Sequence, residues 1–299
     1  MKIAVIGIGN KGFLGGINGP YTPMQTHVGA IEATPGLELV AVADVDVEKL
    51  TAFKEVQPNV SAFTDYEEMM YSKSDIVAVV TPPSTHAQIA KNLMRYDSVK
   101  CIVLEKPACV YETEGASLLK MQREFGIPVI VNHSRRYMYN WQAFIKAVKE
   151  VSPVRHTAGL CNGEPIDAGV HMFDLFNWIN APTHTYVDLY EEKLGKYRPY
   201  LVFDLIAYCE KGVIAMMNNG YTLISVPTGK RAYRDLNEAL WDEAETNFFF
   251  NQVELEVAMV NMYKEAVTIA EGKRKKPTCS LKDGVKAVGM VNKHRLGIR

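Results

Sequence analysis

The sequence predicts an α/β protein with a doubly wound parallel sheet in its N-terminal part and a mostly antiparallel open sheet in its C-terminal part. Short apolar segments alternate with helical segments as far as residue 133, a pattern typical of a parallel sheet. Beyond residue 133, several apolar strands follow one another without helices between them, which favours antiparallel pairing. We therefore expect two domains, residues 1–133 and 134–299, with the last helix able to pack back on the first domain.

Composition and charge argue against several classes of protein. The chain has 299 residues and a net charge of −1, so its overall charge suggests neither a nucleic-acid partner nor an anionic membrane. No run approaches the ~20 apolar residues that a membrane span needs. The chain enters its first strand at once, so we expect no signal peptide. Its five cysteines form no CxxC pair, so we expect reduced thiols in a cytoplasmic protein.

A glycine-rich turn follows the first predicted strand, residues 2–6. It reads Gly7-Ile8-Gly9-Asn10-Lys11-Gly12, a GxGxxG pattern immediately after a strand. Glycines there permit a tight turn and let backbone amides approach a pyrophosphate. We therefore expect Gly7, Ile8, Gly9, Asn10 and Lys11 to bind a dinucleotide.

The next predicted strand, residues 37–43, ends on Asp44. An acid in this place is suited to bind an adenosine ribose and to repel a 2′-phosphate, and no arginine follows closely, so NAD is favoured over NADP. The alternative is a solvated strand-end aspartate. Asp44 follows Gly12 by 32 residues, whereas the usual spacing is about 20. We therefore predict an insertion over residues 13–25, rich in glycine and proline, and a first helix over residues 27–33.

Further strands are expected over residues 62–64, 75–80, 101–104 and 127–131, and helices over residues 50–56, 87–95 and 113–125. The strand at 101–104 leads directly into Glu105-Lys106-Pro107. The carboxyl end of a buried parallel strand is where open α/β sheets place their ligands. Lys106 can there donate to a substrate hydroxyl or act as a base. The alternative is a solvated cation paired with a carboxylate.

Beyond residue 133, the pattern predicts helices over residues 141–151, 167–179, 254–271 and 281–293. Strands are expected over residues 154–160, 186–190, 201–209, 213–217 and 221–226. Asp167 and His171 stand four residues apart and would share a helix face, so that Asp167 orients His171 for proton exchange with a substrate hydroxyl. The alternative is a capping acid and a core histidine. A metal site that includes Glu164 has no further ligand signal, and we expect no metal.

These motifs occur together in one order. They are the glycine loop, Asp44, Thr81-Pro82 with His86, Glu105-Lys106-Pro107, Ser134-Arg135-Arg136-Tyr137, and Asp167 with His171. In this the sequence resembles the Gfo/Idh/MocA family of glucose–fructose oxidoreductase and inositol dehydrogenase. The resemblance implies an NAD(P)-binding Rossmann domain, an α/β domain with an open sheet, and hydride transfer between nicotinamide and a sugar, cyclitol or sugar derivative. That sheet commonly serves as an oligomer interface in the family, so we expect a homodimer or homotetramer.

The resemblance also implies roles for the matching residues. Lys106 would be catalytic or orient the substrate, and Asp167 and His171 would transfer the proton. Thr81, Pro82 and His86 would line the nicotinamide side. Glu105 would support Lys106 and the cofactor ribose. Arg135 or Arg136, with Tyr137, would border the substrate pocket.

Two departures from the family pattern are visible. Glu164-Pro165 stands where the family usually has a glycine pair, and only about thirty residues separate the sixth strand from Asp167. The second domain is thus expected to be shortened and to lack one or more strands. Two other functions stay open, a non-catalytic NAD-binding regulator or scaffold and a glycoside hydrolase that uses NAD transiently. The sequence does not identify the substrate.

Overall fold

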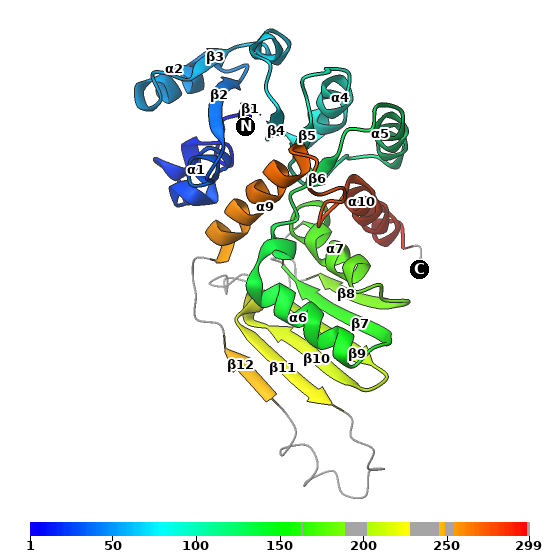
Figure 1. The fold of residues 1–299 in the computed structure, drawn as a ribbon. Helices are drawn as coiled ribbons and strands as arrows, with labels where there is room; N and C mark the ends of the chain where they lie inside the picture. Colours follow the sequence, from blue (N-terminus) through cyan, green and yellow to red (C-terminus); the bar gives the residue numbers. More distant parts are fainter. Residues whose placement is uncertain (163, 189–201, 228–244, 249–253, 298–299) are drawn as a thin grey trace, which may run out of the picture. The chain divides into compact units, whose positions relative to one another are not determined.

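The computed structural model describes residues 1–162, 164–188, 202–227, 245–248 and 254–297 (Figure 1). The chain divides into two compact units. Unit 1 comprises Met1–Tyr137 and Leu255–Gly289, and unit 2 comprises Met138–Glu254 and Met290–Arg299.

Unit 1 is built on a parallel sheet with the strand order β3-β2-β1-β4-β5-β6. This is the order of a doubly wound dinucleotide-binding fold, and it confirms the predicted fold class of the N-terminal part. Every residue of the central strands β4 and β5 is buried, because helices cover both faces of the sheet. The strands are β1 (Lys2–Ile6), β2 (Glu38–Ala43), β3 (Ser61–Phe63), β4 (Ile76–Val79), β5 (Cys101–Leu104) and β6 (Val129–Val131).

Two helix ends of unit 1 carry capping signals that are visible in the sequence. Asp46 caps α2 by accepting from the amides of Glu48 and Lys49, and Gly126 ends α5 in the left-handed conformation with φ +71°. The helices are α1 (His27–Glu32), α2 (Val47–Val56), α3 (Tyr66–Met69), α4 (Pro83–Leu93), α5 (Glu112–Phe125), α9 (Glu254–Ala270) and α10 (Leu281–Arg295). The part of α10 from Met290 onward belongs to unit 2.

We expected residues 134–299 in the second domain, with the last helix able to pack back on the first. Residues 255–289, which include α9 and the first part of that last helix, group with the N-terminal sheet. The reason is close packing on β6. The amide of Val131 donates to the carbonyl oxygen of Cys279 at 3.0 Å. A Cβ at Gly284 of α10 would lie 2.8 Å from a methyl group of Val131. The chain therefore returns to unit 1 after the second sheet.

Unit 2 contains a six-stranded sheet with the order β12-β11-β10-β9-β7-β8. All described pairings are antiparallel except β7 with β8, which confirms a mostly antiparallel sheet. Strand β12 was not predicted. The sheet has six strands, and the expected loss of strands relative to the family stays a prediction. The predicted residues 189, 190 and 201 lie outside the described residues. The strands are β7 (Val154–Cys161), β8 (His184–Asp188), β9 (Phe203–Cys209), β10 (Gly212–Met217), β11 (Thr222–Pro227) and β12 (Glu245–Phe248).

Helices α6 (Tyr139–Glu150) and α7 (Val170–Trp178) pack on the same face of this sheet. The ring of Trp141 on α6 meets Phe203 of β9 edge-on, with centroids 5.6 Å apart. A Cβ at Gly159 of β7 would lie 2.6 Å from Met172 of α7. Gly159 pairs with Leu205, which shares a face with Phe203. Both helices therefore cover one face.

The predicted helix over residues 167–179 starts differently from our expectation. Pro165–Gly169 form a π-turn, in which the amide of Gly169 reaches back to the carbonyl of Glu164 at 3.3 Å, and α7 follows it. Asp167 lies inside this turn and His171 lies at the start of α7, so the two are not joined by one regular α-helix, and their pairing stays a prediction. The proline at the start of the turn lacks an amide hydrogen, which fits its first position.

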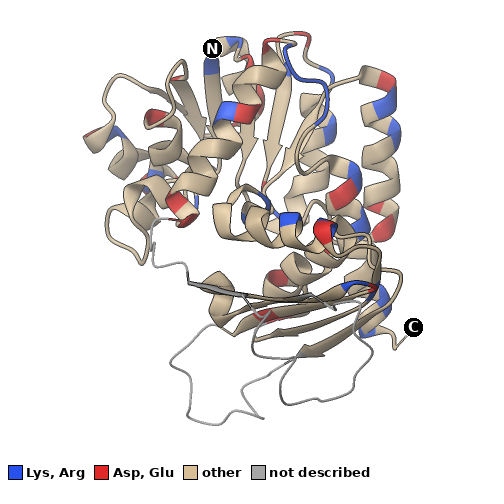
Figure 2. Ribbon diagram, turned by 60° about the horizontal axis from the view of Figure 1, so that its bottom comes forward, with Lys and Arg blue, Asp and Glu red and all other residues tan. Residues whose placement is uncertain are grey.

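No described helix is long and apolar enough to cross a membrane. Basic and acidic residues are interspersed over the helices (Figure 2).

Candidate functional site

The glycine loop after β1 forms a cradle for a phosphate group. Gly7 adopts φ +92°, and a Cβ there would lie 2.6 Å from the carbonyl oxygen of Val80; a Cβ at Gly12 would lie 2.2 Å from that of Gly7. These two glycines are required by packing. By contrast, a Cβ at Gly9 would meet nothing within 4 Å. Open space at the second glycine is what close approach of a pyrophosphate requires.

The loop also presents unused hydrogen-bond donors. Within the described residues, the amides of Gly9, Asn10, Lys11 and Gly12 donate to no protein acceptor. They precede a helical turn that starts with the bond from the amide of Phe13 to the carbonyl of Gly9 at 2.9 Å. The first four amides of a helix lack intrahelical partners and attract anions. The backbone therefore fits the pyrophosphate of a dinucleotide at the predicted place.

The predicted insertion lies inside the first helix, not inside the cradle. The amides of His27 and Val28 donate to the carbonyls of Lys11 and Gly12, each at 2.9 Å, as if they followed directly in the same helix. The chain between, with its 3₁₀ turns Leu14–Gly16 and Pro23–Gln25, is looped out. It packs tightly on α1, because a Cβ at Gly29 would lie 2.1 Å from the carbonyl oxygen of Pro23.

Asp44 ends β2 next to this loop. Its Oδ2 accepts from the amide of Ile8 at 2.9 Å, and its Oδ1 accepts from the amide of Asp46 at 3.0 Å. The ammonium group of Lys49 lies 3.6 Å from Oδ1 and 3.4 Å from a carboxylate oxygen of Asp46. Asp44 thus lies at the predicted end of β2, and the cation of Lys49 beside it was not predicted.

Thr81, Pro82 and His86 form the turn after β4 and the start of α4. The hydroxyl of Thr85 donates to that of Thr81 at 2.7 Å. The ring of His86 is buried; its Nε2 lies 2.7 Å from the carbonyl oxygen of Thr81, and its Nδ1 lies 2.8 Å from that of Pro107. His86 therefore ties the turn after β4 to the turn after β5, and a role beside nicotinamide stays a prediction.

Glu105 follows β5 and is 9% exposed. Its Oε1 accepts from the ring Nε2 of His27 at 2.8 Å and from Asn132 at 2.6 Å, and its Oε2 accepts from the amide of Lys106 at 3.1 Å. Burial alone would raise the pKa of Glu105, but the hydrogen bond and charge of His27 and the charges of Lys106 and Lys11 lower it to about 2. Glu105 is therefore an anion, and half-buried Lys106 follows it at the carboxyl edge of the sheet.

The predicted substrate-side residues after β6 have buried contacts. Tyr137 is 3% exposed, and its hydroxyl donates to Glu265 at 2.5 Å. Arg136 is also buried and donates to the carbonyl of Thr278 at 2.8 Å. Arg135 is half-buried. These contacts hold the segment Ser134–Tyr137 against the loop before α10, and substrate binding by Arg135 and Tyr137 stays a prediction.

Unit 2 carries the predicted proton-transfer pair. Asp167 is exposed within the π-turn, and His171 is half-buried at the start of α7. A Cβ at Gly169, between them, would lie 2.5 Å from the hydroxyl of Tyr186 on β8. Gly169 thus lets α7 approach the sheet closely, and π-turns are frequent at functional sites.

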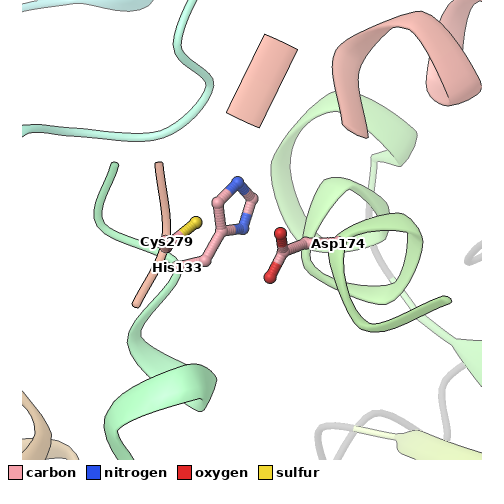
Figure 3. Close-up of side chains that lie close together, drawn as sticks. All are labelled: His133, Asp174 and Cys279. Carbon is pink, nitrogen blue, oxygen red and sulfur yellow. The ribbon is translucent and has the colours of Figure 1, made fainter. Parts of the chain in front are cut away.

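Two features of unit 1 were not predicted from the sequence. One is the pair His27 and Asn132, which bind Glu105. The other is His133 and Cys279, both fully buried, whose side chains lie within 4.8 Å of one another (Figure 3). Asp174, also labelled there, is a buried residue of α7 in unit 2. No local pattern distinguishes such buried histidines from exposed ones.

Comparisons with known proteins match the N-terminal part and the fold. A model of the oxidoreductase family with an NAD-binding Rossmann fold, GFO_IDH_MocA, matches residues 1–133. The uncharacterized oxidoreductase YdgJ of Escherichia coli (strain K12) is 26% identical over 118 residues, which span 39% of this chain. The match covers 33% of that relative, about a third of its length.

Several solved structures share the fold over the whole chain at low identity. An oxidoreductase from Agrobacterium radiobacter, in complex with NAD+, L-tartaric acid and magnesium, has a TM-score of 0.78 and 12% identity; 100% of this chain and 96% of that chain are covered. UDP-N-acetylglucosamine 3-dehydrogenase GnnA from Acidithiobacillus ferrooxidans has a TM-score of 0.74 and 15% identity, with coverage of 100% and 97%. The WlbA dehydrogenase from Bordetella pertussis, in complex with NADH and UDP-GlcNAcA, has a TM-score of 0.73 and 15% identity, with coverage of 100% and 96%.

The structural likenesses show the fold, and the family model identifies the first domain. The free amides from Gly9 to Gly12 and the parallel strand order agree with both. Residues 1–133 therefore belong to the Gfo/Idh/MocA oxidoreductase family and form its NAD-binding Rossmann domain.

Proposed function

We propose that the chain is an NAD-dependent oxidoreductase that transfers a hydride between NAD(H) and a secondary alcohol or carbonyl of a sugar, cyclitol or sugar derivative. The observation that carries the proposal is the set of free amides from Gly9 to Gly12 at the sheet edge where Lys106 follows β5. A loop that can bind the cofactor and a cationic side chain that can bind the substrate oxygen, both at one edge of the sheet, are suited to hydride transfer. Two structures with this fold support the substrate class. One is a UDP-N-acetylglucosamine 3-dehydrogenase, and the other is a dehydrogenase in complex with UDP-GlcNAcA.

Each protein residue has a distinct part in the proposed reaction. Lys106 donates to the substrate oxygen and holds it. His171 takes the hydroxyl proton while the C–H bond of the same carbon breaks and the carbonyl forms, and Asp167 orients His171. When bound, NAD supplies the acceptor for the hydride.

Asp44 supports NAD as the preferred cofactor. Its carboxylate is held in place by the amides of Ile8 and Asp46 and bears a charge that repels a 2′-phosphate. Lys49, which lies 3.6 Å from Asp44, reduces this repulsion. The proposed preference for NADH over NADPH is therefore modest.

The face of the second sheet opposite α6 and α7 supports a homo-oligomer. Strand register places Ala158, Ile206, Ala215 and Ile224 side by side on this face, all partly exposed. Leu160, Val213, Met217 and Val226 lie on the same face. A contiguous apolar face of this kind is typical of an interface. We infer that a second copy of the chain covers it.

The first experiment is a titration of the purified protein with NADH and, separately, NADPH, followed by cofactor fluorescence and by quenching of Trp141 and Trp178. A screen of sugars, cyclitols and nucleotide sugars then follows NADH formation. Binding with turnover on any of these supports the proposal. Binding without turnover favours a regulator, sugar release without net NADH favours a hydrolase, and absence of binding to either cofactor rejects all three NAD-dependent functions.

A further inference from the structure

A buried chain of polar side chains runs behind Glu105 in unit 1. The ring of His27 is fully buried; its Nε2 lies 2.8 Å from Glu105 Oε1, and its Nδ1 lies 2.5 Å from the hydroxyl of Tyr263 on α9. Tyr263 is also fully buried, and its ring meets that of His27 edge-on at 5.8 Å. Three elements, α1, β5 and α9, therefore meet at one histidine.

His27 is also tied to the cofactor cradle through its backbone. Its amide donates to the carbonyl of Lys11, within the loop that presents the free amides. Its side chain reaches Glu105, whose other oxygen accepts from the amide of Lys106. One residue thus links the phosphate loop to the strand end that carries the proposed catalytic lysine.

Stability alone does not account for this arrangement. Burying an ionised carboxylate and a histidine costs desolvation free energy, and well-packed apolar residues often serve stability equally well. Glu105 nevertheless accepts hydrogen bonds on both carboxylate oxygens, from His27, Asn132 and the amide of Lys106. These three donors fix its position, as expected where a neighbouring group must be held accurately.

We propose that His27 is a positioning residue, which is supported from behind by Tyr263, fixes the Glu105 carboxylate and thereby fixes the backbone that presents Lys106 beside the cofactor cradle. The catalytic consequence rests on the proposed function, whereas the structural consequence for Glu105 does not. Tyr263 can serve in either protonation state of His27, because a phenol both donates and accepts. Burial and the charge of Glu105 hold the pKa of Tyr263 well above its usual value, so it remains a phenol.

The groups that face Glu105 determine what removal of His27 does. Lys106 and Lys11 contribute positive charge, Asn132 and the amide of Lys106 donate hydrogen bonds, and Tyr263 stands behind the histidine. Burial favours the protonated form of Glu105, and without His27 fewer contacts favour the anion. Glu105 therefore takes up a proton at a higher pH than in the wild type. A protonated Glu105 loses the negative charge next to Lys106.

The experiment compares His27→Leu, His27→Gln and Tyr263→Phe with the wild type. His27→Gln keeps an N–H that can donate to Glu105. Tyr66→Phe, a tyrosine of α3 whose hydroxyl contacts Asn92, is the matched control. Infrared difference spectra between neutral pH and about pH 4 report protonated carboxylic acids, and Glu105→Gln, alone and combined with His27→Leu, identifies the band of Glu105. Circular dichroism reports folding, and NADH titration and kcat against pH complete the set.

We expect a Glu105 acid band in His27→Leu that the wild type and His27→Gln lack, and that the double variant loses. We expect kcat to fall about tenfold or more in His27→Leu, with a new acid limb in its pH profile, while the NADH dissociation constant changes less than about threefold. Tyr263→Phe should lower kcat about threefold or more, and Tyr66→Phe should leave it unchanged.

Two results would overturn the proposal. One is a folded His27→Leu with no Glu105 band and a wild-type pH profile. If His27→Leu does not fold, Tyr263→Phe decides. The proposal is then overturned if Tyr263→Phe has the kcat and the pH profile of the wild type. Should the wild type turn over no substrate, the proposed function fails, while the infrared comparison still decides whether His27 holds Glu105.

Discussion

The amide of His27 donates to the carbonyl oxygen of Lys11 at 2.9 Å, although the whole insertion lies between them in the sequence. The bond has the pattern of one α-helix that begins at the glycine loop and resumes at α1. Phe13 follows Gly9 in the same pattern, so Thr26 would occupy the single position between Phe13 and His27. The insertion is therefore an outward excursion that leaves the phosphate-binding end of the helix intact.

Deletion of residues 14–25 should consequently preserve cofactor binding. Joining Phe13 to Thr26 restores a continuous helix in the correct register, and the amides from Gly9 to Gly12 keep their positions. We expect the NADH dissociation constant to change less than about threefold, measured by cofactor fluorescence. The cation–π contact of Lys11 with Tyr21, 3.9 Å from the ring centroid, would be lost, at a cost to stability of about 0.5–1 kcal/mol.

A circular-dichroism melt of the deletion variant separates loss of folding from loss of binding. A folded variant that no longer binds NADH would show that the excursion itself contributes to the cofactor site. Deletion of residues 14–24 is the matched control. It leaves one extra residue in the rejoined helix and shifts the helical register by one, so this variant should bind NADH more weakly.

The fold of unit 1 could be predicted because its strands are uniformly apolar and its turns carry glycine and proline. β4 and β5 lie within the apolar runs that predicted them, residues 75–80 and 101–104. The long spacing between Gly12 and Asp44 correctly indicated an insertion. The return of α10 to this unit was among our expectations for the last helix. The grouping of α9 had no local signal, since it depends on tertiary contacts such as that of Tyr263 with His27. Strand β12 is short and polar in sequence, Glu-Thr-Asn-Phe, and resembles a loop.

The parts of the candidate site that a sequence motif places on the backbone could be predicted. The contacts that depend on tertiary packing between distant residues could not. The glycine loop, Asp44 and Lys106 follow strands, so their place at the sheet edge follows from topology. The π-turn around Asp167 was not predictable from a helical pattern of apolar residues. The hydrogen bonds of His27 with Glu105 and Tyr263 join residues that are far apart in the sequence. Local residue spacing therefore could not predict them.

Replacement of the proposed catalytic residues should abolish most turnover without loss of cofactor binding. Lys106→Ala and His171→Ala should each lower kcat by about 10²-fold or more, the usual effect of losing a general acid or base. Neither side chain belongs to the phosphate cradle, so the NADH dissociation constant should stay close to that of the wild type. Steady-state kinetics on the substrate from the screen measures this, with Lys120→Ala on the exposed side of α5 as the control. Near-full turnover in either variant would refute its role.

Asp44 and Lys49 should act in opposite directions on cofactor choice. Asp44→Ser removes the charge that repels a 2′-phosphate, so the ratio of the NADPH to the NADH dissociation constant should fall by about tenfold. Lys49→Met removes the neighbouring cation, 3.6 Å from Asp44, and should raise that ratio. Fluorescence titrations with both cofactors give the ratio, and Lys120→Met controls for net charge. Equal ratios in all variants would show that the ribose lies elsewhere.

Charge on the open face of the second sheet should dissociate the proposed oligomer. Ile206→Glu and Ala215→Glu place carboxylates on neighbouring strands of that face, since the two residues pair directly. A buried unpaired charge at an interface is strongly unfavourable. Light scattering coupled to size exclusion should report an oligomer for the wild type and a monomer for these variants. Lys149→Glu, on the exposed side of α6, should keep the wild-type mass, and a monomeric wild type would contradict the inference.

Glu105 should make the stability of the protein depend on acidic pH. Its pKa is about 2 in the folded state, below the ordinary value of 4.5. A lowered folded-state pKa gives stability that is fully present above the unfolded value and is lost as the pH falls from about 4.5 toward about 2. At neutral pH the contribution is about 3 kcal/mol, because one pKa unit corresponds to about 1.4 kcal/mol. Urea unfolding of the wild type and Glu105→Gln should therefore give free energies that differ most at neutral pH and approach each other as the pH falls from about 4.5 toward about 2. A difference that is independent of pH would mean that Glu105 is not held as an anion by His27 and Asn132.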